Sequence, residues 1–168
     1  MQMETYDFGL GYPILIFEKY KILTKVEISA IYNVLMQNYC QTLHTEVMVM
    51  DSMIKKQIIP STEKYIKVLC DTVLSKKQIT AQIDCSAEIQ LISLLSTLLS
   101  ELYNNTDILK ENLITSNKIP NLFERSKFYY KKIFSVLNKI RKSADKIEQN
   151  IDKKLWPFPS YSDILFEF

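Results

Sequence analysis

Glycine is nearly absent from this chain of 168 residues, since the two that occur are Gly9 and Gly11, whereas average usage is about 7%. Glycine supplies, at low energetic cost, the positive φ angles found in tight hairpins, at Schellman helix ends and in phosphate-binding loops. Its absence beyond residue 11 therefore argues against hairpin-joined strands and against a nucleotide-binding loop. We expect long helices joined by few turns.

The chain also lacks a strong excess of either charge, because 21 Lys and Arg side chains face 19 Asp and Glu side chains. The resulting net charge of +2 is too weak to steer a polyanion to the whole surface, so nucleic acid is not an expected partner. One basic cluster stands out, but apolar residues at helical spacing separate its charges, which favours a solvated helix face over a phosphate-binding patch. Its members are Lys131, Lys132, Lys139, Arg141 and Lys142.

Features of exported or membrane proteins are missing as well. The N-terminus carries Glu4 and Asp7 where a secretory signal would carry basic residues. The longest uncharged stretch, residues 28–45, is interrupted by amide side chains, while a membrane span needs about 20 mainly apolar residues. An odd number of cysteines without a CxxC pair fits reduced thiols. We expect a cytoplasmic protein with no membrane segment. The cysteines are Cys40, Cys70 and Cys85.

No motif of known catalytic chemistry is present: neither G-x-S-x-G nor H-E-x-x-H occurs. The lone histidine, His44, stands two residues from Glu46, a spacing that does not aim both at one metal on a helix, so a structural role is favoured. Glu46, Asp51 and Glu63 could form a catalytic pair only if the helices bring them together, and charges on amphipathic helices usually face water. We expect no catalytic, cofactor or metal site in this chain.

The chain begins with an arm that contains both glycines and a proline, followed by a short apolar segment at residues 14–20. Thr24, with Glu27 three residues later, has the form of a capping box, so a helix should begin there. We predict one domain with three parts. They are an N-terminal arm and short apolar segment (1–23), a helical bundle (24–155) and a docking tail (156–168).

The first long helix should keep one face apolar for about eight turns, because apolar residues recur at steps of three or four. Pro60 lacks an amide donor and crowds the preceding turn, so the helix must stop or bend near Ile59, and a kink is favoured. The segment at 61–77 would then continue the rod at a new angle, before a turn at 76–84. The apolar positions are Ile28, Ile31, Leu35, Tyr39, Leu43, Val47, Met50, Ile54 and Ile58.

Two further segments carry seams with alternating steps of three and four, and Asp84 or Ser86 can cap the first of them. Matching seams joined by a short loop predict an antiparallel hairpin packed at roughly 20°. Leu91, Leu94 and Leu98 widen the first seam, so the hairpin needs a further neighbour, the kinked rod. We predict an all-α fold, an antiparallel three- or four-helix bundle with long, kinked helices. The seams are Ile92, Leu95, Leu99, Leu102, Thr106, Leu109 and Leu113, then Ser126, Tyr130, Ile133, Leu137, Ile140, Ala144, Ile147 and Ile151.

Four methionines in the first helix are interpreted as adaptable core packing rather than as a recognition groove. The C-terminal tail is different, because it concentrates aromatic area in a segment that prolines keep from being helical. Folding back over its own bundle is favoured over docking on another domain or subunit, and both remain open. The methionines are Met36, Met48, Met50 and Met53. The candidate docking residues are Trp156, Pro157, Phe158, Pro159, Tyr161, Leu165 and Phe166.

Several stretches together resemble a known family. They are FEKY at 17–20, Glu46 and Met50 with MIK at 53–55, IIP at 58–60, and above all the closing WPFPSYSDILF at 156–166. From about Phe17 to Phe168 the chain resembles the C-terminal region of type III glutamine synthetases. It departs from that pattern in an unmatched arm at 1–13 and in Ser61, where alanine is common.

The family's enzymes join ammonia to glutamate with ATP hydrolysis, on a barrel that precedes this region. The resemblance implies that ATP and a divalent metal would belong to that barrel, and that this chain is not an enzyme on its own. It also implies a structural, oligomer-packing part of a cytoplasmic homo-oligomer, with the catalytic barrel or neighbouring subunits as partners. The alternative is a free-standing helical protein-interaction module. A stand-alone enzyme has only scattered carboxylates in its favour.

Overall fold

The structure, a computed structural model, describes residues 11–159 and 163, and every regular element within them is helical. The all-α prediction is therefore confirmed for the described residues. Most of the expected N-terminal arm lies outside them, and Gly11, its last glycine, already begins a helix. The elements are α1 (Gly11–Lys19), α2 (Lys25–Met53), the π-helical turn η1 (Ile54–Ile58), α3 (Ile59–Ile79), α4 (Ser86–Asn117), α5 (Leu122–Phe128), the π-helical turn η2 (Tyr129–Ile133) and α6 (Phe134–Glu148).

Helix α1 ends in a Schellman motif built on a lysine. Lys21 has φ 54°, in the left-handed region. The Ile22 amide donates to the Phe17 carbonyl at 2.9 Å, and the Lys21 amide donates to the Glu18 carbonyl at 3.0 Å. The scarcity of glycine argued against this type of helix end, and that expectation is wrong at Lys21. The two hydrogen bonds offset a conformational cost of about 1–2 kcal/mol for a residue with a Cβ.

The predicted capping box opens α2. The Thr24 hydroxyl accepts from the Glu27 amide at 3.3 Å, while the Glu27 carboxylate accepts from the Thr24 amide at 2.7 Å. Glu18 of α1 adds a third contact, because its carboxylate accepts from the Lys25 amide at 3.1 Å. These bonds satisfy amides that the first turn of a helix leaves free. They also fix the short α1 against the start of α2.

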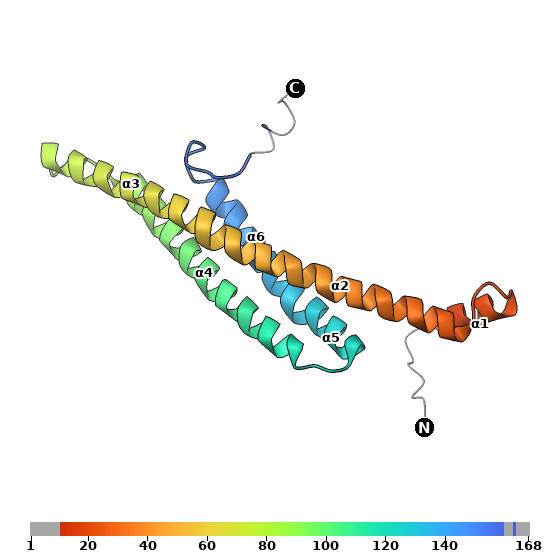
Figure 1. The fold of residues 1–168 in the computed structure, drawn as a ribbon. Helices are drawn as coiled ribbons and strands as arrows, with labels where there is room; N and C mark the ends of the chain where they lie inside the picture. The colour runs from red at the N-terminus through yellow and green to blue at the C-terminus, as the bar shows by residue number, and fades with distance from the viewer. Residues whose placement is uncertain (1–10, 160–162, 164–168) are drawn as a thin grey trace.

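The helix does not stop at Pro60; α2, η1 and α3 run on as one long rod (Figure 1). The distortion that proline requires takes the form of the π turn just before it. There the Ile59 amide donates to the Ile54 carbonyl, five residues back. Pro60 then sits in the first turn of α3, where its missing amide costs least. The fully buried Thr62 donates its hydroxyl to the Ile58 carbonyl at 2.8 Å and closes the next turn.

Helix α4 packs along α6, and α3 packs on α4 (Figure 1). The α4 seam is buried as predicted from Leu95 to Leu113, apart from the half-buried Ile92 ahead of it. Asp84 accepts from the Ser86 amide at 2.9 Å, although the residue that caps α4 is Cys85. Of the residues that widen the seam, Leu98 is buried, Leu91 is half-buried and Leu94 is 42% exposed.

The second seam departs from prediction in one turn. Tyr130 was expected inside, yet it is 64% exposed, whereas the neighbouring Tyr129 is 2% exposed. The cause is η2, whose Phe134 amide donates to the Tyr129 carbonyl five residues back and shifts the register of the turn. Tyr130 instead stacks on Phe134 at the surface, with ring centroids 6.2 Å apart.

The apolar face of α2 is also placed differently. Ile31, Leu35 and Tyr39 were expected inside, but they are 47%, 59% and 37% exposed. The covered residues step by four at the start of the helix, from Ile28 through half-buried side chains to Cys40. Among the described residues, α2 lies against α1, α5 and α4. The first half of α2, with α1, extends beyond the α4–α6 hairpin (Figure 1).

Candidate functional site

Two aromatic residues of the predicted docking tail lie against the core of the molecule. Trp156 and Phe158 are half-buried and pack on the main hydrophobic cluster. Their rings meet edge to face, with centroids 5.6 Å apart and an interplanar angle of 76°. Pro157 and Pro159 between and beyond them are exposed. In this part of the tail, therefore, the prolines space the aromatic residues and the aromatic rings make the contact.

The chain turns into the tail through a short hydrogen-bonded loop. The Asp152 carbonyl accepts from the Leu155 amide at 2.9 Å and from the Trp156 amide at 3.1 Å. Lys153 forms an ion pair with Asp163 at 2.5 Å, and the backbone of Asp163 is helical. The non-helical prediction thus holds for residues 156–159 and not at Asp163. Three other candidate docking residues lie outside the described part of the chain: Tyr161, Leu165 and Phe166.

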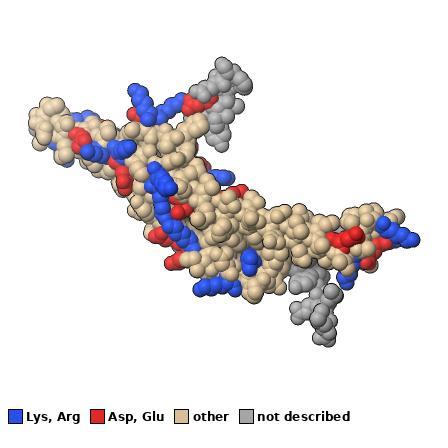
Figure 2. Space-filling view, viewed as in Figure 1, with Lys and Arg blue, Asp and Glu red and all other residues tan. Residues whose placement is uncertain are grey.

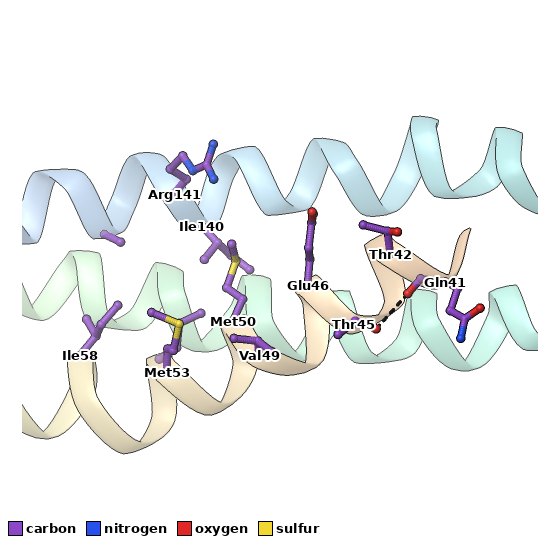
Figure 3. A pocket seen from close by; sticks show the side chains of 12 residues that line it. Gln41, Thr42, Thr45, Glu46, Val49, Met50, Met53, Ile58, Ile140 and Arg141 are labelled. Atoms are coloured by element: carbon purple, nitrogen blue, oxygen red, sulfur yellow. Dashed lines mark hydrogen bonds between the residues drawn. The ribbon is translucent and has the colours of Figure 1, made fainter. Parts of the chain in front are cut away.

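A groove of about 750 Å³ lies between α2 and α6 (Figure 3). Met50, Met53 and Ile140 form part of its apolar lining, and Glu46 and Arg141 contribute charged side chains. Met50 packs against the core as the sequence predicts, but Met53 is 37% exposed at the groove and Met48 is 58% exposed. The interpretation of the α2 methionines as core packing is therefore wrong for Met48 and Met53.

The lone histidine takes part in a contact between helices. The Tyr129 hydroxyl lies 3.4 Å from Nδ1 of His44, which joins η2 to α2. Within the described ranges, 11–159 and 163, no three His, Cys, Asp or Glu side chains lie close enough together to hold a metal ion. The structural interpretation of His44 thus has a physical basis in a polar contact across the helix interface.

The three carboxylates considered for catalysis lie in different surroundings. Asp51 forms ion pairs with Lys55 at 2.8 Å and with Lys110 of α4 at 3.5 Å, and its carboxylate raises the pKa of Lys55. Glu46 lies at the groove, while Glu63 is exposed on α3. This arrangement favours a structural role for Asp51.

The remaining polar features are a basic cluster and the three cysteines. Every member of the basic cluster at 131–142 is exposed, as expected for a solvated helix face. The cysteines are free, and burial raises the pKa of the Cys40 thiol, which lowers its reactivity. None of the described helices combines the length and the apolar character that a membrane crossing requires.

A second apolar surface on α2 has no cover among the described residues. We define this outer face as Ile31, Val34 and Leu35, which are 47%, 55% and 59% exposed. In Figure 2 the first half of α2 forms an uncharged zone between the charged end at α1 and the charged hairpin. Ile28, Ile31 and Leu35 are spaced by three and four residues and lie along one stripe of the helix, of which only Ile28 is covered. The sequence thus showed that this stripe is apolar and did not show that part of it is exposed.

Comparisons with known proteins agree on one family. Residues 12–77 match the family model described as glutamine synthetase C-terminal domain. The glutamine synthetase of Butyrivibrio fibrisolvens is 26% identical over 151 residues, which cover 90% of this chain. The chain spans about a fifth of the length of this curated relative, since the match covers 22% of it.

The two matches differ in how much of the fold they include. The family model covers α1 and the rod formed by α2, η1 and α3, almost to its end. The match to the relative extends over most of the hairpin as well. Both support the predicted resemblance at the level of glutamine synthetases, and neither specifies the type. This chain therefore contains a region similar to the C-terminal region of glutamine synthetases.

Proposed function

We propose that this chain serves as the C-terminal helical region of a type III glutamine synthetase and packs the catalytic barrel and its subunits together. The enzyme would make glutamine from glutamate, ammonia and ATP in the cytoplasm, with the barrel carried outside these residues. The observation that supports this most is the match to a glutamine synthetase over 90% of the chain. The long helical rod and the half-buried tail aromatics are suited to packing.

The proposed role divides the work between two parts of the enzyme. Rigid helices supply large surfaces with little loss of conformational entropy on binding, because they are already ordered. A barrel holds the groups that bind ATP, metal and glutamate. On this view ATP and a divalent metal act on the barrel, and this region determines how barrels are arranged in a homo-oligomer.

Purification from the cells that make the chain tests this proposal. An affinity tag on the chain should retain glutamine synthetase sequence beyond this region, whether on the same polypeptide or on a separate one. Removing residues 11–159 should then reduce the native mass of the glutamine synthetase assembly, measured by light scattering. Recovery of the chain without any such sequence would reject the proposal and favour a free-standing interaction module.

A further inference from the structure

The outer face of α2 is not needed for the chain's own core. On the opposite side of the same helix Met36 is half-buried and Cys40 is 7% exposed. The outer residues lie on the same turns, yet about half or more of each side chain contacts water. Contiguous exposed apolar residues of this kind mark interaction sites on soluble proteins. Half of α2 is thus covered, and half is left for another surface.

The first half of α2 also has a long stretch without charged side chains. No Asp, Glu, Lys or Arg occurs from Ile28 to Thr45, although most of these side chains are exposed. A surface helix normally presents charged residues to water on its outer side. Charged side chains are depleted at the centres of protein interfaces, where removing them from water is costly. The outer face and the stretch around it therefore have the composition of an interface centre, where amides such as Asn38 can pair with neutral polar groups.

The comparisons indicate what covers it. The family model matches residues 12–77, which contain the whole outer face and stop before the hairpin. In the relative, 22% of the length corresponds to this chain, so the larger part of that enzyme lies outside the match. A region described as C-terminal receives the preceding polypeptide at its first helix. In this chain that helix is α1, which adjoins the end of α2 that bears the outer face.

We propose that the outer face of α2 is the surface on which the preceding part of a glutamine synthetase packs. This inference rests on the proposed function and adds the surface and the occupant. An α2 that docks through its outer face is held between two neighbours, the chain's own α5 and hairpin on one side and the enzyme's other part on the second. Helix α2 would then lie between the two parts of the enzyme, with its covered side on this chain's own core and its outer face on the preceding part.

Site-specific photo-crosslinking tests the surface in the cells that make the protein. Benzoylphenylalanine is placed at Leu35, which is 59% exposed on the outer face, and in a matched control at Leu74, which is 60% exposed on α3. Illumination at position 35 should yield crosslinked peptides from glutamine synthetase sequence outside this region, several times more than at position 74. Crosslinks to a second copy of this chain, to an unrelated protein or to nothing would overturn the proposal.

A charge substitution gives an independent measurement. Leu35→Lys should reduce the fraction of glutamine synthetase found in its native assembly about ten-fold or more, measured by light scattering, because it places an unpaired charge at an interface centre. This readout holds whether the sequence beyond this region is on the same polypeptide or on a separate one. Leu74→Lys should leave the assembled fraction unchanged, and neither should alter folding much, since both sites are exposed. If both variants assemble equally, the surface is wrong while the proposed function stands. If the unsubstituted chain retains no glutamine synthetase sequence, the proposed function itself fails.

Discussion

Lys21 occupies a backbone conformation that glycine adopts at much lower cost. Its φ of 54° ends α1, and two backbone hydrogen bonds hold it there. A side chain that begins at Cβ is crowded against the carbonyl in this region. The helix end is therefore maintained by its hydrogen bonds and by the capping box that follows. The Cβ of Lys21 destabilises this conformation.

We predict that Lys21→Gly stabilises the chain by about 0.5–1 kcal/mol, because glycine adopts positive φ without the Cβ penalty. Urea unfolding followed by circular dichroism measures the change. Lys67→Gly, on an exposed lysine inside α3, is the control and should destabilise by about 1 kcal/mol. Destabilisation by both substitutions would show that Lys21 is not held in the left-handed region.

Tyr129 and Tyr130 are neighbours with opposite surroundings, which makes them a sharp test of η2. Tyr129→Ala should destabilise by about 3–5 kcal/mol, since it removes a buried ring and the contact to His44. Tyr130→Ala should cost no more than about 1 kcal/mol, because its ring is largely exposed. Chemical denaturation of the two variants decides between them. A larger destabilisation by Tyr130→Ala than by Tyr129→Ala would indicate that Tyr130 is the buried residue, as in an uninterrupted seam, and would contradict the π turn.

At the scale of elements, α3 and α4 are tied by an ion pair between Lys76 and Glu88 across their turn. The Lys76 ammonium lowers the pKa of Glu88 from its usual 4.5, and the Glu88 carboxylate raises the pKa of Lys76 from 10.5. A lowered carboxyl pKa contributes stability that is complete above the unfolded value and is lost as pH falls through the folded value. A raised lysine pKa contributes stability that is complete below its unfolded value and is lost as pH rises through the folded value.

We therefore predict that Glu88→Gln lowers the melting temperature near neutral pH, and that this deficit shrinks as pH falls below 4.5. The reason is that protonation removes the same charge from the parent chain. Differential scanning calorimetry from pH 7 to pH 3 measures the difference. Glu63→Gln, on an exposed side chain of α3, removes one carboxylate without touching the ion pair and serves as the control. A Glu88→Gln deficit that stayed constant down to pH 3 would argue against the ion pair.

At the scale of the whole molecule, the described part of the tail tests whether the bundle needs it. Replacing both Trp156 and Phe158 with alanine should destabilise by about 1.5–3 kcal/mol, because two half-buried rings leave the hydrophobic cluster. The expected readout is a lower melting temperature. The double substitution of the exposed Pro157 and Pro159 with alanine is the control and should change it little.

The same variants separate the two interpretations of the tail. Unchanged melting of the double aromatic variant, together with failed assembly of glutamine synthetase, would assign the tail to a partner. Unchanged melting with normal assembly would contradict both interpretations. A lower melting temperature with intact assembly would assign the tail to the chain's own core, as the packing of Trp156 and Phe158 indicates.

The sequence by itself determined the features that depend on neighbours along the chain. Helix content, the capping box of Thr24 and Glu27, and the α4 seam from Leu95 to Leu113 follow from interactions three or four residues apart. Of the seven candidate docking residues, the apolar composition of the tail correctly pointed to Trp156 and Phe158 as packing residues, whereas Pro157 and Pro159 are exposed. Local patterns carry such information because a helix fixes which residues share a face.

Only the tertiary structure decided which of those faces is covered. Ile31 and Leu35 are as apolar as Ile28, and their exposure follows from the position of α1, α5 and the hairpin around α2. Tyr129 replaces Tyr130 in the core because η2 shifts the register by a fraction of a turn. Burial is set by neighbours distant in sequence, so a chain can specify a broad apolar surface on one helix without specifying which part of it the fold will cover.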